Sequence, residues 1–182
     1  MQDRTGRQGR KLQGQVSELW GSPQSQQAPA LVFVWTTERE STRTERDERG
    51  EVRRVTETLV DHHQRAVSPA STEIGVDLRL DQRLKGLMWY SLYDVDFDGA
   101  WTYVHAEEIP GTLAVSLQFP DMEGLYDSFV FAVDGEDLAR TLKPVHGGVT
   151  ARIPVEPGQT VTLDVGYVSR GMGEWRYVPS PD

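Results

Sequence analysis

The sequence predicts an all-β protein, an antiparallel β-sandwich of about nine or ten strands with a long charged hairpin and one short N-terminal helix. Apolar and polar residues alternate along several short segments, which is typical of antiparallel strands with one buried and one solvated face. Gly, Pro and Asp separate these segments at short intervals, as the turns of such a fold require. The 182 residues suffice for one domain whose core needs no disulfide or metal.

The N-terminal segment has a different pattern from the rest. Residues 1–10 are polar and basic, and we expect a flexible N-terminus there, followed by a single sandwich domain at 11–182. In 11–20 the apolar side chains recur at the spacing of one helical face, at Leu12, Val16, Leu19 and Trp20. This spacing predicts a short helix, which ends at Gly21-Ser22-Pro23, and a polar loop at 24–29.

Residues 30–61 predict the long hairpin. An apolar run rich in β-branched and aromatic residues at 30–35 is typical of a buried strand, and 51–61 has the pattern of a returning strand. Four Thr and one Ser lie among the charged residues of 36–44, which favours strand over helix and places charges on both faces. We therefore expect the hairpin tip, with a turn at 47–50, to stand in solvent.

The remaining strands follow from alternation or from β-branched runs. They are predicted at 74–80, 93–103, 113–119, 129–133, 149–155, 161–167 and 176–178. The alternation at 74–80 predicts that the face carrying Ile74, Val76, Leu78 and Leu80 is buried. One helical turn is predicted at 136–142.

Charge and composition exclude several classes of function. The net charge is −9, and residues 66–182 carry the acidity, with 18 acidic against 8 basic residues. Such a surface argues against nucleic acid as the main partner. The absence of Cys excludes disulfides, thiolate metal sites and a cysteine nucleophile. The sequence has neither an apolar run long enough for a membrane span nor the apolar region of a signal peptide. We expect no cofactor.

The segment Asp94-Val-Asp-Phe-Asp-Gly99 has the opening pattern of a calcium-binding loop, with candidate ligands at Asp94, Asp96 and Asp98. The twelfth position, which should supply a bidentate Glu, is occupied by His105. The aromatic and aliphatic residues between the carboxylates alternate as in a strand. An acidic strand face is therefore the favoured interpretation, and calcium binding the alternative.

The histidines and the other acidic residues do not have the spacing of a catalytic or metal-binding motif. His62 and His63 are neighbours on a predicted strand, so their side chains face opposite ways and cannot share a metal. His105 and His146 have no partner that the sequence reveals. A hydrolase is one further hypothesis, using an acid/base pair of carboxylates chosen from Glu107, Glu108, Asp121 and Glu123. Nothing in their spacing distinguishes these acids from ordinary surface residues.

Aromatic residues gather in two places. Trp89, Tyr90, Tyr93, Trp101 and Tyr103 lie within fifteen residues, and Trp175 and Tyr177 lie near the end. On the 93–103 strand they share the face of Val95, which favours a place in the core. If exposed, Trp89, Trp101, Trp175 and Tyr177 would suit a carbohydrate-binding sandwich that stacks sugars on aromatic rings.

Three segments resemble the CreD-type inner-membrane proteins. Trp20-Gly21-Ser-Pro-Gln24, followed by Ala28-Pro-Ala-Leu31, is similar to the W-G-x-x-Q…G-P-x-L element after the first membrane helix of that family. Arg83-Leu-Lys-Gly86, with Tyr93 to Gly99-Ala-Trp101 after it, resembles its R-x-R-G…V-Y…G-x-F stretch. Near the end, Tyr167-Val-Ser-Arg170-Gly171 through Trp175-Arg-Tyr177 is similar to a Y-x-S-x-G…W-x-Y element of CreD-like proteins.

The resemblance implies a non-enzymatic domain on the periplasmic face of the bacterial inner membrane, linked to envelope stress or envelope maintenance. It implies structural roles for Trp20, Gly21, Gln24, Arg83, Gly86, Gly99, Arg170 and Gly171. The expected partners are other segments of the parent membrane protein or an envelope protein, with the hairpin tip at 43–54 as the contact. A glycan and a second copy of the chain are further candidate partners.

Overall fold

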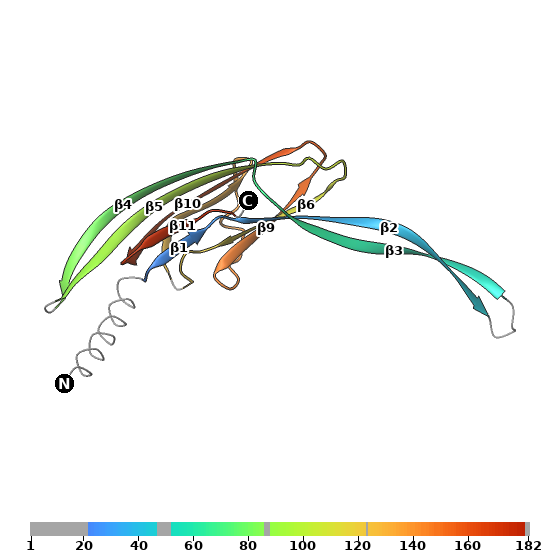
Figure 1. Ribbon diagram of the computed structural model, residues 1–182, viewed down its shortest axis with the longest axis horizontal. Coiled ribbons are helices and arrows are strands. Elements are labelled where there is room, and N and C mark those ends of the chain that lie inside the picture. The colour runs from blue at the N-terminus through green and yellow to red at the C-terminus, as the bar shows by residue number, and fades with distance from the viewer. Residues whose placement is uncertain (1–21, 47–51, 86–87, 123, 181–182) are drawn as a thin grey trace, which may run out of the picture.

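The computed structural model describes residues 22–46, 52–85, 88–122 and 124–180, and all regular structure within these ranges is β-strand (Figure 1). The predicted helix at 11–20, the flexible N-terminus at 1–10 and the hairpin turn at 47–50 lie outside the described residues. So do Trp20, Gly21, Gly86 and Glu123. The prediction of an all-β protein is confirmed for the part that is described.

Two antiparallel sheets and one parallel pair make up the fold. The larger sheet has the order β4 (Ser71–Lys85), β5 (Met88–Val104), β10 (Thr160–Met172), β7 (Tyr126–Val133) and β8 (Glu136–Asp137). The smaller has the order β3 (Val52–Val67), β2 (Ala30–Arg46), β6 (Gly111–Gln118) and β9 (Gly148–Val155). The parallel pair is β1 (Gln24–Gln27) with β11 (Trp175–Val178). Both sheets are open, and they pack in a sandwich-like arrangement.

The main core is made of side chains from both sheets, with Phe33, Phe97, Leu113 and Phe131 fully buried. Along β5 the predicted alternation is confirmed, because the side chains from Tyr93 to Tyr103 on the face of Val95 are buried. At Gly99, where that face has no side chain, the ring of Trp101 fills the space: a Cβ there would lie 2.2 Å from the indole. The glycine is therefore required by close packing.

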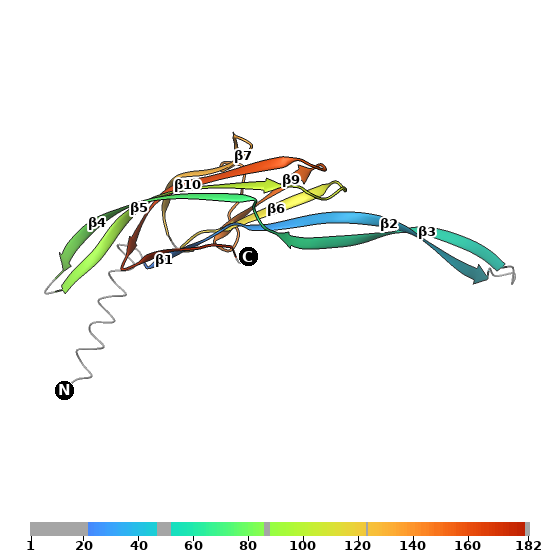
Figure 2. The ribbon, with the colours of Figure 1, turned by 45° about the horizontal axis from the view of Figure 1, so that its top comes forward.

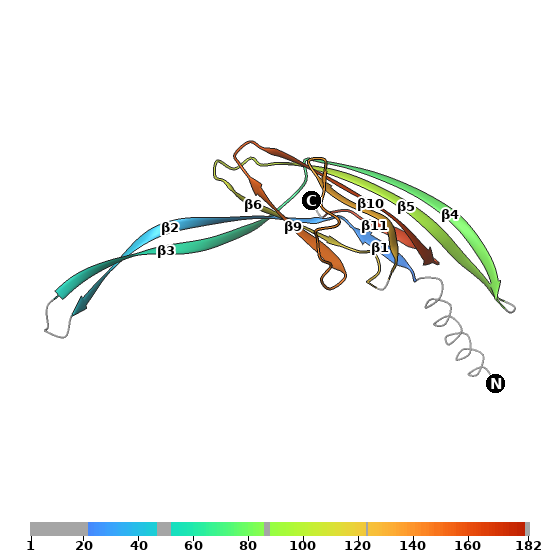
Figure 3. The ribbon, with the colours of Figure 1, turned by 180° about the vertical axis from the view of Figure 1, so that it is seen from behind.

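Two long hairpins project from opposite ends of the body (Figures 1 and 2). The predicted hairpin at 30–61 is confirmed as β2–β3, and its register runs from Leu31 opposite Val67 to Arg46 opposite Val52. The other hairpin is β4–β5, in register from Ser71 opposite Thr102 to Lys85 opposite Met88. Figure 3 shows both from behind, with β1 and β11 beneath the five-stranded sheet.

Three predictions of local structure need correction. The polar loop expected at 24–29 is the strand β1 over Gln24–Gln27. The helical turn expected at 136–142 is divided between β8 and one turn in which the backbone N–H groups of Thr141 and Leu142 donate to Leu138 O. The face of β4 that alternation predicted to be buried is largely exposed, and Leu78 is 51% accessible. No described strand of the opposite layer covers β4, which explains the difference.

Five of the six tyrosines have raised pKa values, and burial is the main cause in each: Tyr93, Tyr103, Tyr126, Tyr167 and Tyr177. For Tyr93 burial raises the pKa from 10.0 to about 12. The unfolded chain releases these protons near pH 10, while the folded chain keeps them. The stabilisation is thus complete below pH 10 and is lost as the pH rises through the folded values.

We predict that the free energy of unfolding falls steeply above pH 10, and that Tyr93→Phe makes the fall shallower. Removing one such group should reduce the slope by about 1.4 kcal/mol per pH unit up to a pH of about 12, the folded pKa of Tyr93. Urea unfolding between pH 9 and 12 measures both slopes. Parallel curves for the two proteins would contradict the prediction.

Candidate functional site

The first and last described strands meet at one junction, and its centre is the side chain of Gln24. The Gln24 backbone N–H donates to Glu174 O at 3.0 Å, and Gln24 Nε2 donates to Arg170 O at 3.1 Å. Ser169 Oγ donates to Gln24 Oε1 at 3.0 Å. Gln24 is almost fully buried, so these bonds satisfy an amide that would otherwise be unpaired in the interior.

Gln26, two residues further along β1 and on the same face of the strand, has a similar arrangement. Its Oε1 accepts a hydrogen bond from Tyr167 OH at 3.0 Å, and its Nε2 donates to Gln118 O at 3.2 Å. Gln26 therefore connects β1 to strands of both sheets. Local sequence pattern gives no sign of this, because the partners lie 141 and 92 residues away.

The glycine and arginine positions of the family resemblance have structural contacts. Gly171 lies under the ring of Tyr93, where a Cβ would approach the phenol oxygen to 2.2 Å, and Tyr93 OH donates to Glu174 O at 2.5 Å. Arg170 pairs with Asp94 at 2.8 Å. Arg83 pairs with Asp81 at 2.8 Å, and this arginine lowers the pKa of the Asp81 carboxyl.

The four candidate stacking residues are divided between interior and surface. Trp101 is 3% exposed, and Trp175 and Tyr177 turn inward with their rings 5.9 and 6.4 Å from that of Phe97. Only Trp89, at 69%, presents an open ring. Trp101 is therefore a core residue, and a sugar platform there is excluded in this conformation.

The inward aromatics leave some polar atoms without partners. The indole N–H groups of Trp101 and Trp175 and the hydroxyl of Tyr177 are buried and make no hydrogen bond within the described chain. Burial raises the pKa of the Tyr177 hydroxyl, and the nearby Trp101 indole partly opposes this rise. The indole of Trp175 opposes in the same way the rise that burial causes in the pKa of the Tyr167 hydroxyl.

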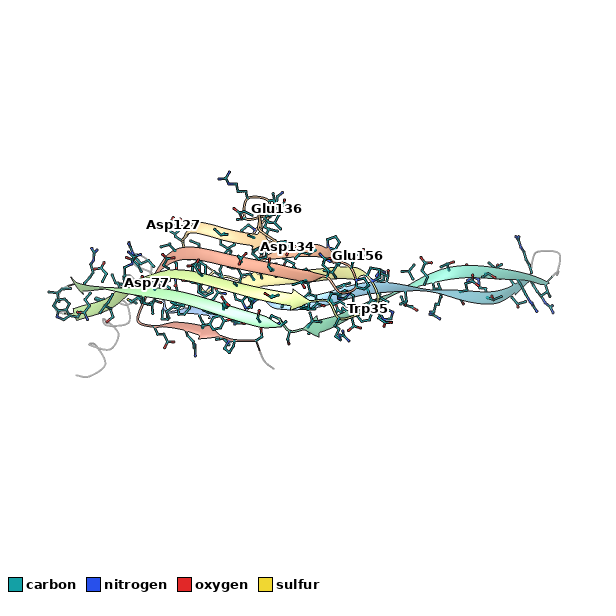
Figure 4. The ribbon with its side chains drawn as sticks, turned by 90° about the horizontal axis from the view of Figure 1, so that it is seen from above. Trp35, Asp77, Asp127, Asp134, Glu136 and Glu156 are labelled. Carbon is teal, nitrogen blue, oxygen red and sulfur yellow. The ribbon has the colours of Figure 1, made fainter. Side chains whose placement is uncertain are left out.

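Acidic side chains cover the outer face of the five-stranded sheet (Figure 4). Asp94, Asp96 and Asp98 point to this face, as the alternation predicts, and Asp77 of β4 lies directly opposite Asp96. Among the described residues, no three Asp, Glu, His or Cys side chains lie close enough to hold a metal ion. The calcium candidates therefore form an acidic strand face in this structure.

A shallow depression of about 400 Å³ lies on this outer face. Its floor is low because Gly75 and Gly166 flank Asp98 on the two neighbouring strands and carry no side chains. The carboxylates of Glu73 and Asp164 stand at its rim. The depression is open and acidic, so it suits a solvated cationic group better than an apolar one.

Two of the four histidines and one of the candidate acids have structural contacts. His105 is fully buried: its Nδ1 lies 3.1 Å from Tyr103 OH and its Nε2 2.8 Å from Ile109 O. His63 Nε2 lies 2.8 Å from Thr37 Oγ1, at the base of the β2–β3 hairpin. Glu107 pairs with Arg65 of β3.

Among the acids proposed for a hydrolase, Glu107 and Asp121 contact different partners, and Glu123 lies outside the described residues. Asp121 accepts a hydrogen bond from Ser22 Oγ, whereas Glu107 pairs with Arg65 of β3. Glu108 makes no ion pair with a described residue. The geometry thus gives no support to an acid/base pair among them.

The β2–β3 hairpin becomes a free ribbon beyond Trp35. β2 pairs with β6 only over Ala30–Val34, and farther out it pairs with β3 alone. Trp35 stacks on Phe33 and His63 at centroid distances of 5.1 and 5.2 Å and marks where the core ends (Figure 4). We call the ribbon, residues 36–46 and 52–62, the β2–β3 arm.

Charges on the arm pair with one another, both across its two strands and along β2. Arg39 contacts Asp61 at 2.8 Å, and Arg43 contacts both Glu45 and Glu57 at 2.9 Å. All of these side chains are well exposed, so each ion pair stabilises the arm by only about 0–1 kcal/mol. An isolated two-stranded ribbon is marginally stable in water. The arm is therefore a projecting element with little support from the body.

We predict that Gln26→Leu destabilises the protein by about 1–3 kcal/mol, because the buried Tyr167 O–H loses the oxygen that accepts its hydrogen bond. Adding Tyr167→Phe should recover part of this loss, since both polar groups are then removed together. Chemical unfolding of the wild type, both single variants and the double variant measures the coupling. Strictly additive losses would contradict the hydrogen bond.

Comparison with protein-family models, with curated proteins and with solved structures gave no match to this chain. Within the described residues, the structure contains no helix of the length and apolar character that crossing a membrane requires.

Proposed function

We propose that this chain is the extracytoplasmic β-sandwich domain of a CreD-like inner-membrane protein, non-enzymatic, and acting through contacts made by the β2–β3 arm. One observation carries the proposal. Two of the three segments that resemble the family, around Gln24 and around Arg170 to Tyr177, lie about 150 residues apart in the sequence and touch in the structure.

The contact between these segments explains why particular residues of the two motifs are needed. The amide of Gln24 holds the backbone of β10 at Arg170 and is held by Ser169. Gly171 leaves room for the Tyr93 ring, whose hydroxyl fixes the turn at Glu174. Gln24 of the W-G-x-x-Q element and the terminal Y-x-S-x-G…W-x-Y element thus form one junction, which supports treating the two segments as a linked pair.

The parallel pairing of β1 with β11 brings the two resembling segments side by side. Gln24 lies opposite Trp175 and Gln27 opposite Val178, so the first and last described strands run side by side. Because the pair is parallel, the chain enters at the Gln24 end and leaves at the Val178 end, so the two connections lie about 10 Å apart at opposite ends of this short pair.

The arm supplies the contact in this proposal. It carries charges of both signs on both faces, which suits a polar protein surface better than an apolar or strongly anionic one. In the part of the chain that the structure describes, the arm makes no contact with the body that would explain its length. We infer that it reaches another segment of the parent membrane protein or a second envelope protein.

We predict that an alkaline phosphatase fused after Ser180 in the full gene product is active in bacterial cells. That enzyme needs disulfides, which form outside the cytoplasm. A green fluorescent protein exported in unfolded form through the same junction should stay dark. Phosphatase activity and fluorescence measured on whole cells provide the readouts. An inactive phosphatase with a bright fluorescent fusion would place the domain in the cytoplasm and reject the proposal.

We predict that deleting residues 39–59, and joining Glu38 to Val60 through Asn-Gly, leaves the body folded. The two joined residues are cross-strand partners, so a two-residue turn fits between them. The melting temperature should change by less than about 4 °C, because the removed residues contribute no core contacts. Thermal unfolding followed by circular dichroism measures this.

The same arm should be the part that meets a partner. A photo-crosslinking residue placed at the exposed Thr44 should yield a defined adduct in intact cells. The matched control is the exposed Glu156, in a turn of the body, which should yield none (Figure 4). Equal adducts at both positions, or none at Thr44, would remove the arm from the proposed contact.

A further inference from the structure

Strand β4 is a long edge strand with one side open. It pairs with β5 through all 15 of its residues and with no other described strand. From Ser71 to Leu84 every residue except Ile74 and Asp81 is exposed. A row of unpaired backbone N–H and C=O groups therefore faces solvent along this edge, and such a row is a template for pairing with another strand.

The other edges carry features that discourage pairing. The edge strand β9 contains Pro154, which lacks an N–H. β8 has only two residues, and the part of β7 that it leaves unpaired is interrupted at Ser128, whose φ is +54°. β11 has four residues. β3 carries charged side chains on both of its faces. β4 has none of these devices: it is long, contains no Pro, and keeps one face apolar.

The apolar face of β4 lies on the core side of the sheet. Val76, Leu78 and Leu80 stand opposite Phe97, Val95 and Tyr93 of β5, which are buried. The β4 side chains themselves are 39%, 51% and 66% exposed. This stripe of exposed apolar residues is continuous with the core and is left uncovered at the edge.

The outer face of β4 carries charges that are poorly matched within the chain. Asp77 lies directly opposite Asp96 of β5, and like charges in this position destabilise a sheet. Asp77 and Arg79 form no ion pair with any described residue. A cation brought to the open side of Asp77 would relieve the repulsion.

We propose that two copies of this chain associate through β4, pairing it antiparallel with β4 of the second copy around a two-fold axis at Leu78. The five-stranded sheets would then join into one continuous sheet. The contact is isologous, so every favourable pair occurs twice. This inference rests on the edge strand alone and is independent of the proposed function.

The pairing around Leu78 is complementary on both faces. On the core side, Leu78 meets Leu78 and Val76 meets Leu80 of the second copy. On the outer side, Asp77 meets Arg79, and Glu73 meets Arg83, which also keeps Asp81 on its own strand. Apolar and opposite-charge pairs of this kind each stabilise an antiparallel contact.

Other registers fit less well. A shift that pairs residues of unlike parity would place apolar side chains opposite charged ones. Axes at Asp77 or Arg79 set two like charges against each other. An axis at Leu80 again pairs opposite charges, but it uses only residues 75–85. The axis at Leu78 pairs the whole strand from Ser71 to Lys85.

A charge exchange tests both the contact and its register. Asp77→Arg sets two arginines against each other across the axis, yet within the chain it replaces the repulsion from Asp96 by attraction. It should therefore weaken the dimer about tenfold or more without destabilising the monomer. The double variant Asp77→Arg/Arg79→Asp should restore association to within about threefold of the wild type. With the axis at Leu80 the double variant would instead be worse than the single.

Sedimentation velocity gives the dissociation constant, and urea unfolding of the same variants checks the monomer. A contact of this size is expected to be weak, so concentrations should extend to about 0.3 mM. A wild type that stays monomeric over the whole range would overturn the proposal. So would a double variant that associates no better than Asp77→Arg.

A single cysteine gives an independent test, because the chain has none of its own. Directly opposed Cβ atoms on antiparallel strands lie about 4.5–5.5 Å apart, close to what a disulfide spans. Leu78→Cys should therefore form a covalent dimer at least about tenfold faster than a cysteine at an unpaired edge. The matched control is Val60→Cys on edge strand β3, since Leu78 and Val60 are 51% and 50% exposed.

The result also identifies the axis and any other occupant of the edge. Fastest cross-linking of Leu80→Cys or Val76→Cys would overturn the register centred on Leu78. A Leu78→Cys variant that neither cross-links nor reacts with a small thiol reagent would mean that another segment covers β4. That outcome would overturn the dimer.

Discussion

The fold depends on the docking of β1 onto the inner face of the five-stranded sheet through two buried amides. Gln24 and Gln26 have no apolar surface that would drive them into a core, and only their hydrogen bonds to Ser169, Arg170 and Tyr167 make their burial tolerable. β11 follows β1 as its parallel partner and lays its aromatic rings over Phe97. Without this docking, the inner face around Tyr167 would be open to water.

The two layers cover each other unequally, and the exposed surfaces follow from this. β1 and β11 extend the smaller layer over β10 and β5, but no described strand continues it over β4. At the other end, β2 and β3 run on where the five-stranded sheet offers them nothing to cover. The same mismatch thus produces a charged ribbon, the β2–β3 arm, at one end and an uncovered apolar edge, β4, at the other. The sequence distinguishes them, because the arm carries charges on both faces and β4 carries them on one.

Sequence pattern located the long hairpin and the buried face of β5 because both are local properties of a strand. It did not locate β1, since nothing near Gln24 shows that a serine 145 residues away will bond to it. The partners of His105 were also not predicted. Tyr103 and Ile109 are near it in the sequence, but Ile109 O reaches the His105 ring only because the chain bends between the two residues. Alternation correctly assigned Leu78 to the core-side face, yet it could not show whether a second layer would lie there.

The stacked rings of Phe33, Trp35 and His63 at the base of the arm have a mechanical consequence. From Trp35 outward β2 runs about twelve residues, or about 40 Å, in extended conformation. A rotation of a few degrees at this aromatic base moves the far end by several ångströms, while the base itself hardly shifts. The packing of these three rings therefore sets the direction in which the arm leaves the body, and so the position of its far end.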